Sequence, residues 1–255
     1  MKNPKALSGG VVFARRNVLE TMRSPASWAF GLALPIGIFI IMQIIVNSIG
    51  ERAAANVPMF GVDRFTGGAV IFGAAFLSLF CAMLISSDRA QSFLSRLYAS
   101  PLTSVDYIVG YMLGVLPIAA AQSVTIFVAA LCFGLTPTVN ILPALLFAVL
   151  FSVMFVSIGM IFGSTLSAKG APPVCSAVVQ VAALLSGMWF DLDMIGGGFA
   201  VFCRVFPFAH VYDIIRYALT GDWANVWLPF VIAFAYTVAL TAVAVVVFEK
   251  RAKKG

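Results

Sequence analysis

DRAQSFLSRLYASPLTSVDYIVGY, residues 88 to 111, is a polar segment with two arginines that stands between two long apolar runs. Such a segment cannot remain in hydrocarbon, where charged and unpaired polar groups are costly. It therefore marks a point at which the chain leaves a bilayer. The apolar runs on either side of this segment are therefore candidates for membrane-spanning helices.

The composition places the chain among polytopic membrane proteins. It is 62% hydrophobic and 10% charged, whereas an ordinary soluble domain is about 25% charged. The net charge of +6 does not indicate nucleic-acid binding, because the Lys and Arg residues cluster at the ends of apolar runs. The first apolar run starts near Ala26 and exceeds the apolar core of a signal peptide, about 7 to 15 residues, so we expect it to be retained.

Six apolar runs are long enough for membrane-spanning helices, which need about 20 residues. We expect an all-α membrane protein with one domain over residues 1 to 255, since open strands would leave backbone groups unpaired in lipid. The predicted spans are residues 26 to 48, 67 to 87, 107 to 133, 142 to 166, 172 to 190 and 226 to 248.

Residues 5 to 24 are too polar to span but are amphipathic. At about 100° per residue, one face carries Leu7, Val11, Ala14, Val18 and Met22, and Arg16, Glu20 and Arg23 fall opposite. This pattern predicts a helix lying in the membrane interface with its cationic side toward anionic headgroups. A soluble helix that binds a partner is the alternative, ranked second because Ser24-Pro25 leads directly into a span.

The distribution of Lys and Arg predicts the orientation. With the N-terminus in the cytoplasm, twelve of the sixteen basic residues fall on the inner side and four fall outside. The outer four are Arg52, Arg64, Arg204 and Arg216. By the positive-inside rule both termini are expected in the cytoplasm, with the chain in the inner (plasma) membrane.

Residues 191 to 225 are too apolar for a free loop. They contain two short apolar stretches split at Pro207, each too short to cross, which predicts a re-entrant helical hairpin in the outer leaflet. His210 is the only histidine, so a histidine metal site or a catalytic triad lacks partners, and we expect it to make a hydrogen bond within the hairpin. Asp213 and Arg216 have i, i+3 spacing, which suits either an ion pair or two separately hydrated charges.

The predicted spans carry amides and hydroxyls but no charged residue at mid-depth, which argues against an ion-driven transporter. Such polar groups usually bridge helices, and a minority line a path. The candidates for a substrate path are Gln43, Asn47, Gln122 and Gln180. Gly159 and Gly163 have small-xxx-small spacing, which fits packing within the chain or a dimer face equally.

The four cysteines show no metal-binding spacing, and no metal site is expected. Each lies in or beside an apolar run, where a small buried side chain is the favoured interpretation. A bridge between Cys132 and Cys203, which fall near the same predicted face, is the alternative left open.

The chain resembles the permease subunits of ABC-2 type exporters, the group that includes daunorubicin-type drug efflux and polysaccharide-export permeases. The resemblance covers essentially the whole chain and rests on two motifs. In the opening segment the matching residues are Arg96, Leu97, Ser100, Pro101, Leu102 and Gly110. In the hairpin, Pro207 and Arg216 match an Asn-Pro-x8-Arg pattern in which Phe206 replaces the Asn. The chain also departs from the family pattern at Gln91-Ser92, where an acidic residue with Gly-Thr is usual, and at Tyr111, where Lys or Arg is usual.

The resemblance implies that residues 88 to 105 form a cytoplasmic coupling helix held by a separate ATPase subunit. Its apolar contacts would come from Phe93, Leu94, Leu97 and Tyr98, its polar contacts from Arg89 and Arg96, and Pro101 and Leu102 complete the motif. It also implies that the first, second and fifth spans face the route between two permease copies, which favours Gln43 and Gln180 as path residues.

The sequence contains no GxxxxGK[ST] phosphate loop, so we expect no ATPase activity and no cofactor in this chain, with ATP and Mg²⁺ bound by the partner. The expected function is the permease half of an ATP-driven exporter of an amphipathic small molecule. Its expected partners are ABC ATPase subunits, a second permease copy or a related permease, and the lipid bilayer, with no nucleic acid. The alternatives are an exporter of a lipid or glycan and a non-transporting assembly or immunity subunit.

Overall fold

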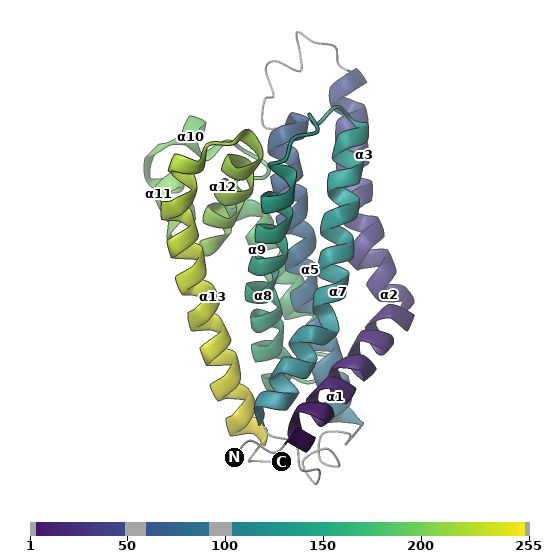
Figure 1. The fold of residues 1–255 in the computed structure, drawn as a ribbon. Helices are drawn as coiled ribbons and strands as arrows, with labels where there is room; N and C mark the ends of the chain where they lie inside the picture. The colour runs from purple at the N-terminus through teal and green to yellow at the C-terminus, as the bar shows by residue number, and fades with distance from the viewer. Residues whose placement is uncertain (1–3, 49–59, 92–103, 253–255) are drawn as a thin grey trace.

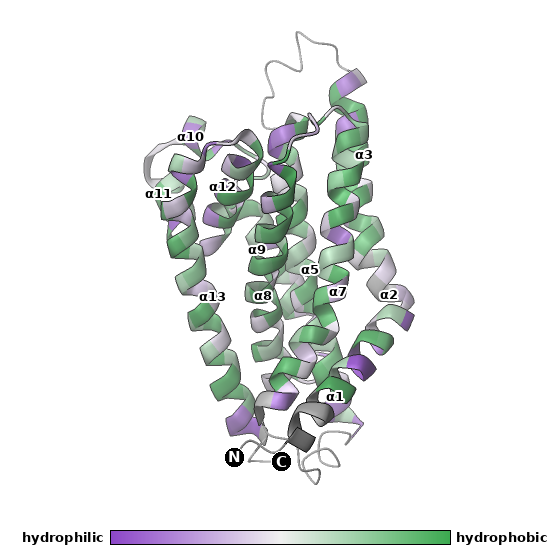
Figure 2. Ribbon diagram, in the orientation of Figure 1, coloured by the Kyte–Doolittle hydropathy of each residue, from purple (hydrophilic) through white to green (hydrophobic). Residues whose placement is uncertain are grey.

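A computed structural model describes residues 4–48, 60–91 and 104–252 of the chain, and all regular structure within these ranges is helical. The helices form one bundle, drawn in Figure 1. α1 and the end of α13 lie at one end of it, called here the α1 end, and the short helices α10, α11 and α12 lie at the other, called the hairpin end. Figure 2 shows apolar residues along the helices and polar residues gathered toward the two ends, as a membrane-spanning bundle requires.

Five helices are long and apolar enough to cross a bilayer, within Gly31–Ser48, Val62–Ala90, Asp106–Cys132, Ile141–Thr165 and Trp223–Arg251. They correspond to α3 (Leu34–Ser48) with the π-helical turn before it, α5 (Val62–Ala90), α7 (Ser104–Cys132), α8 (Ile141–Thr165) and α13 (Trp223–Ala252). These elements confirm the expected all-helical membrane fold.

α9 (Ala171–Leu185) differs from the predicted fifth span, because its 15 residues end well before residue 190. Gly187 adopts a left-handed backbone with φ of 84°, a conformation that stops a helix and that side chains disfavour. The Ser186 hydroxyl accepts a hydrogen bond from Met188 N at 3.2 Å and satisfies a donor in the turn that follows. At about 1.5 Å per residue, α9 is shorter than the hydrocarbon core.

The first predicted span is also not one regular helix. It consists of α2 (Pro25–Trp28), a π-helical turn η1 (Ala29–Ala33) and α3. Pro35 has no N–H to bond the Gly31 carbonyl in the α-helical pattern, and Leu34 N donates instead to Ala29 O, five residues back. The wider turn is therefore the backbone's response to the proline.

α5 is the central helix and is buried along most of its length. α8 approaches its backbone through Gly159 and Gly163: a Cβ at Gly159 would overlap the Ser78 carbonyl, and one at Gly163 would lie 2.8 Å from Ala82 Cα. The small-xxx-small pair thus packs within the chain. On its other side α8 packs on α13, where the Ser157 and Thr241 hydroxyls lie 2.9 Å apart.

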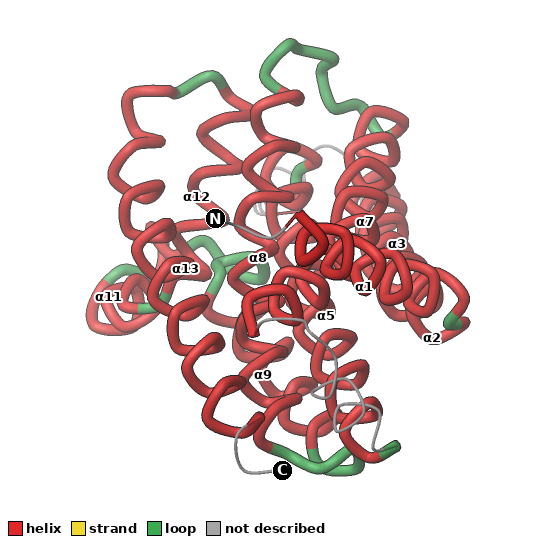
Figure 3. Tube along the Cα trace, turned by 60° about the horizontal axis from the view of Figure 1, so that its bottom comes forward, coloured by secondary structure: helices red, strands yellow, loops and turns green. Residues whose placement is uncertain are grey.

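α1 (Pro4–Arg23) packs along α7, and Figure 3 shows it crossing the α1 end of the bundle toward α2. From residue 11 onward, where burial is described, its buried side chains are Phe13, Ala14, Asn17 and Thr21. Most of the predicted apolar face does not meet the bundle: Ala14 is buried, but Val11 is 62% exposed and Val18 and Met22 are only half-buried. The packing face is turned away because α7 offers two glycines, Gly110 and Gly114, against which Phe13 and Asn17 fit.

Residues 191 to 225 form the expected hairpin. α11 (Gly197–Val205) and α12 (Pro207–Thr220) meet at 92°, preceded by the single turn α10 (Leu192–Ile195). The bend falls at Pro207, which begins α12. Gly221 ends α12 in the left-handed conformation, with φ of 77°.

Candidate functional site: an ion-pair cluster beside the predicted coupling segment

Most of the predicted coupling residues lie outside the described residues, namely Phe93, Leu94, Arg96, Leu97, Tyr98, Pro101 and Leu102. Their role stays a prediction. The structure does describe both flanks of the segment, the last turn of α5 and the first turns of α7. The two flanks are joined to each other and to α1 by polar contacts.

Asp88 is the centre of these contacts. It is 2% exposed, in the last turn of α5, and its two carboxylate oxygens accept hydrogen bonds from Arg16 Nη1 and Nη2, each at 2.8 Å. The Tyr111 hydroxyl of α7 donates to the same carboxylate at 2.8 Å. A paired guanidinium and a phenol thus compensate the cost of burying the charge. One carboxylate joins α1, α5 and α7.

Arg16 is held from both sides of its guanidinium. Besides Asp88 it contacts Glu20, one turn further along α1, at 2.7 Å. The hydrogen bond to Asp88 is the main reason that the pKa of Arg16 lies above its ordinary value, so this side chain keeps its charge at any physiological pH. Burial is the main cause that raises the pKa of Glu20, and the Arg16 charge opposes it.

The packing around the cluster explains why position 110, one of the motif residues, is a glycine. Asn17 Nδ2 donates to the Gly110 carbonyl at 3.2 Å, and a Cβ at Gly110 would overlap the Phe13 ring. Phe13 in turn lies edge-on to Tyr111, with ring centroids 5.0 Å apart. A side chain at position 110 would push α1 off α7 and pull Arg16 away from Asp88.

Arg89, the predicted coupling residue that the structure describes, bonds within the chain. Its Nη1 donates to the carbonyls of Gly163 and Leu166, both at 3.1 Å. These carbonyls lie at the C-terminal end of α8, where backbone acceptors lack helical partners and a cation is favourable. Arg89 therefore ties the end of α5 to the end of α8.

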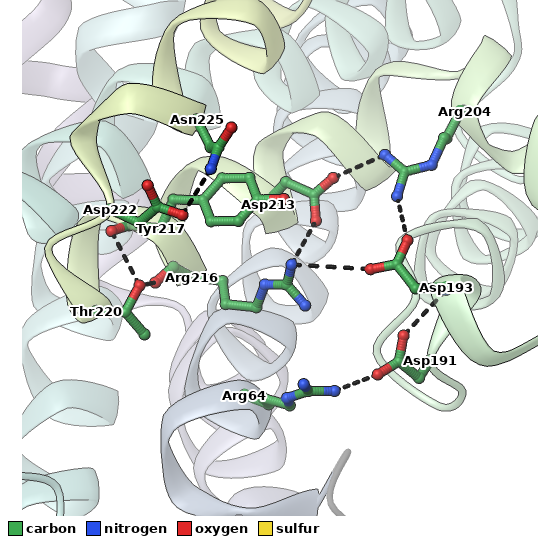
Figure 4. A network of polar contacts seen from close by, with 10 residues as sticks. All are labelled: Arg64, Asp191, Asp193, Arg204, Asp213, Arg216, Tyr217, Thr220, Asp222 and Asn225. Atoms are coloured by element: carbon green, nitrogen blue, oxygen red, sulfur yellow. Dashed lines mark hydrogen bonds and ion pairs between the residues drawn. The ribbon is translucent and has the colours of Figure 1, made fainter.

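A second network of charges closes the hairpin end, as Figure 4 shows. Arg64 at the start of α5 pairs with Asp191, whose other oxygen accepts from Asp193 N at 3.0 Å. Burial works to raise the pKa of Asp191, but the Asp193 N–H and the Arg64 guanidinium outweigh it and hold this pKa below its ordinary value. The contact therefore persists as the pH falls through the physiological range.

Within the hairpin, Asp213 is the buried member of the network. It is 6% exposed and accepts from Arg204 at 3.1 Å, with Arg216 Nη2 at 4.0 Å. The predicted pair of Asp213 and Arg216 is thus present, at the long limit of an ion pair. Arg204 also binds Asp193 at 2.8 Å. His210 has the expected hydrogen-bonding role, since its Nε2 lies 2.8 Å from the Arg204 carbonyl and links α12 to the end of α11.

The residues predicted for a substrate path do not come together. Gln43 is buried and donates to the Phe60 carbonyl at 3.0 Å, while its own oxygen has no partner. Gln122 is 1% exposed. With its amide oriented so that both ends find partners, it donates to Gly31 O at 2.9 Å and Gly73 O at 3.3 Å and accepts from Ala74 N at 3.2 Å. These contacts fit the helix-bridging alternative for Gln122. Asn47 and Gln180 are exposed on the bundle surface, in α3 and α9.

With this geometry in hand, the chain can be compared with known proteins. The model of one family, described as the ABC-2 type transporter, matches residues 11–220, most of the chain. The chain belongs to the ABC-2 type transporter family. It is therefore a membrane component of an ABC transporter rather than its ATPase, and a multi-pass membrane protein. A search among curated proteins gives no match.

The family match ends in the last turn of the hairpin, so it includes both charge clusters and leaves α13 outside. The described residues hold no group of three or more potential metal ligands. The described cysteines are all unpaired, so the alternative of a Cys132–Cys203 bridge is not seen, and Cys203 is buried while Cys132 is exposed.

Sequence reasoning missed the two sides of the main cluster in this ABC-2 permease. The sequence pattern places Asp88 in a polar segment and Arg16 on the cationic face that is expected to meet headgroups, although the two are bonded across 72 positions of sequence. The departure at Tyr111 was the available signal. A tyrosine one turn inside an apolar span has to place its hydroxyl on a buried acceptor, and Asp88 is the acidic residue at the matching depth.

Proposed function

We propose that this ABC-2 permease is the membrane half of an ATP-driven exporter that moves an amphipathic small molecule out of the cell. Two permease chains, identical or related, would bind two separate ATPase subunits that carry ATP and Mg²⁺. The family assignment supports the permease role, and the absence of a phosphate-loop motif from the sequence agrees with a separate ATPase. The charge distribution supports an inner membrane placement with both termini, and so the α1 end, in the cytoplasm.

The observation that carries the coupling mechanism is the Asp88 cluster. Residues 92 to 103 separate α5 from α7 in the sequence, and the described ends of these two helices are bonded to each other and to α1 through Asp88, Tyr111 and Arg16. A displacement of the segment by a closing ATPase would therefore move three helices together. This is what a two-state element needs if ATP binding at one site is to bias the transport path.

A second permease copy is supported by the surface of α9. Gln180 and Ser176 are exposed on this helix among apolar neighbours, including Val181 and Leu184, which are 45% and 47% exposed. An amide facing hydrocarbon is costly, whereas the same amide facing a second helix can make an interhelical hydrogen bond. The α9 face is therefore proposed as part of the surface between two copies.

The direct test of the coupling role is the double substitution Arg96→Glu with Leu97→Asp. In membranes that contain the ATPase, we expect the variant to insert normally and to reach the wild-type protein level. Transport should be lost, because the changes place two acidic residues on the proposed docking surface. The matched control is Ala168→Asp with Lys169→Glu, which makes the same charge changes at two exposed neighbours in the turn between α8 and α9. Normal efflux from the Arg96/Leu97 variant would refute the docking role.

The wider proposal is tested by purification. We expect an ATPase to co-purify with the wild-type chain and its hydrolysis to respond to candidate substrates. A panel of toxic amphiphiles tested on cells without this chain would then separate a small-molecule exporter from an exporter of lipid or glycan. If no ATPase co-purifies and membrane ATP hydrolysis is unchanged when the chain is removed, the exporter assignment is wrong.

A further inference from the structure

An open groove runs along α1 on the side away from α7. Its volume is about 530 Å³, and its lining residues are Val12, Arg15, Arg16, Leu19, Glu20, Arg23 and Ser24. At about 100° per residue, Arg15, Leu19 and Val12 lie roughly opposite the packing face of Phe13, Asn17 and Thr21, and the other lining residues lie on the flank between the two faces. The groove is therefore an outer surface of the protein, beside the Asp88 cluster.

Two cations in the groove have no partner among the described residues. Arg16 is bonded to Asp88 and Glu20, but no ion pair or hydrogen bond of the described part of the chain involves the side chains of Arg15 or Arg23. Arg15, Leu19 and Arg23 follow each other at i, i+4 spacing and so form one stripe. The stripe places two guanidinium groups on either side of an apolar residue that is 41% exposed.

The neighbouring surface of α1 is apolar. Val12 is 68% and Val11 is 62% exposed, and Val18 and Met22 are half-buried on the same flank. Trp28, which is 44% exposed, follows Arg23 by five residues and donates from its ring nitrogen to Met22 O at 2.6 Å. Tryptophan with its polar edge satisfied beside an apolar surface is typical of the boundary between headgroups and acyl chains.

We propose that this groove binds an anionic phospholipid, with the headgroup phosphate held by Arg15 and Arg23 and the acyl chains along Val12 and Leu19. Guanidinium groups bind phosphate through paired charge-assisted hydrogen bonds. A zwitterionic headgroup offers the same phosphate, but its ammonium group offsets part of the attraction, so an anionic headgroup is favoured. The proposal rests on the proposed placement of the α1 end on the cytoplasmic side, where anionic lipids attract basic residues. The proposed lipid would cover the face of α1 that does not pack against α7.

The test uses the full-length chain purified in detergent, with phosphatidylglycerol and phosphatidylcholine as probes and native mass spectrometry as the readout. We expect wild type to retain phosphatidylglycerol in preference to phosphatidylcholine. Arg15→Gln with Arg23→Gln should weaken phosphatidylglycerol binding by about thirtyfold, the factor expected for two basic residues at an anionic surface. Arg15→Lys with Arg23→Lys should keep a large part of the binding, because the charge remains.

The matched control is Lys250→Gln with Arg251→Gln, which removes two exposed charges from the last turns of α13 at the same end of the bundle. It should bind phosphatidylglycerol as wild type does. Equal binding by the Arg15/Arg23 glutamine variant and wild type would overturn the proposal, as would an equal loss in the control. Since both arginines are outside any described ion pair, the glutamine variant should keep the wild-type unfolding temperature.

Co-purification of the ATPase separates this proposal from the exporter assignment. If the Arg15/Arg23 glutamine variant loses the ATPase but still binds phosphatidylglycerol, the groove is a protein contact and the lipid proposal is wrong. If it loses phosphatidylglycerol and keeps the ATPase, the lipid site is supported. Loss of the exporter assignment alone, with selective lipid binding retained by wild type, would leave the lipid site standing.

Discussion

Asp88 has almost no contact with solvent and depends on two donors from other helices, Arg16 and Tyr111. Such a carboxylate is a stabilising element only while its partners are in place, because a buried charge without its counter-ion is strongly unfavourable. Arg16 is about one-third exposed, so water screens part of the interaction. The ion pair thus joins α1 to α5, while the guanidinium group of Arg16 remains accessible to solvent.

The first prediction concerns this pair. Arg16→Ala should lower the stability of the purified chain by about 1–3 kcal/mol, because the buried Asp88 carboxyl group loses its counter-ion and retains only the hydrogen bond from the Tyr111 hydroxyl. Arg16→Ala combined with Asp88→Asn should recover part of that loss, since the buried group is then neutral. Thermal unfolding in detergent measures both. Lys250→Ala is the control, and losses that simply add in the double variant would contradict the buried pair.

The second prediction concerns Gln122 and Gly73. Gly73→Ala should destabilise the chain by about 1–3 kcal/mol, because the new Cβ would overlap the Gln122 carboxamide. Gln122→Ala alone should also destabilise, because it leaves the carbonyls of Gly31 and Gly73 without their donor.

The combination of the two changes is the sharper measurement. With Gln122→Ala present, Gly73→Ala should cost less or even become favourable, since the methyl group enters the space that the carboxamide leaves. Unfolding temperatures of the four proteins give the coupling directly. If the Gly73→Ala cost is the same in both backgrounds, the close approach of Gln122 to α5 is wrong.

At the scale of elements, ion pairs connect the two short helices of the hairpin to each other and to the bundle. α11 has nine residues and α12 fourteen, and neither could stay at a fixed angle on propensity alone. Arg204 at the end of α11 reaches Asp213 in α12 and Asp193 in α10, and Arg64 brings the same network to α5. The hairpin and the central helix are therefore one connected unit at this end of the bundle.

The third prediction follows from this connection. Arg204→Ala should loosen α11 and expose Cys203, which is fully buried, to a water-soluble thiol reagent. In a Cys132→Ser background, alkylation of Cys203 should be about tenfold faster, as expected if the loss costs about 1.4 kcal/mol of local stability. Asp222→Ala, in the turn after α12, should leave the rate unchanged. An unchanged rate in the Arg204 variant would show that the network does not hold α11.

At the scale of the whole molecule, α9 turns polar groups of its middle turns outward, whereas the exposed Asn47 lies at the end of α3. Gln180 and Ser176 of α9 are exposed, whereas Gln43 and Gln122 are buried between helices of the same chain. A complete bundle in lipid would be expected to turn all such groups inward. The contrast supports a second copy against α9.

The fourth prediction tests that copy. Gln180→Cys, in a chain whose four native cysteines are replaced by serine, should form a disulfide-linked dimer in membranes under mild oxidation. Val128→Cys is the matched control, because Val128 is 52% exposed on α7 and lies outside the proposed face. Similar dimer yields from the two positions would contradict an α9 interface.

Much of this molecule follows from the order of apolar and polar residues. Hydropathy alone predicts the long helices, since a helix satisfies its own backbone groups in lipid, and Pro207 between two short apolar stretches predicts the bend of the hairpin. Two motifs, one that includes Gly110 and one that begins at Pro207, indicate the ABC-2 family, and the family match confirms this. These features depend on neighbours in sequence.

Only the tertiary structure shows which residues from different helices contact each other. That Arg16 meets Asp88, that Gln122 fills the space above Gly73, and that α1 packs through Phe13 rather than through Val11 all depend on how helices far apart in the chain approach each other. Hydropathy indicates that a residue is buried or exposed but not which partner it meets. Which helices pack together depends on glycines that leave room for a side chain of another helix and on buried charges that require a counter-ion. Both effects act only when the helices are side by side.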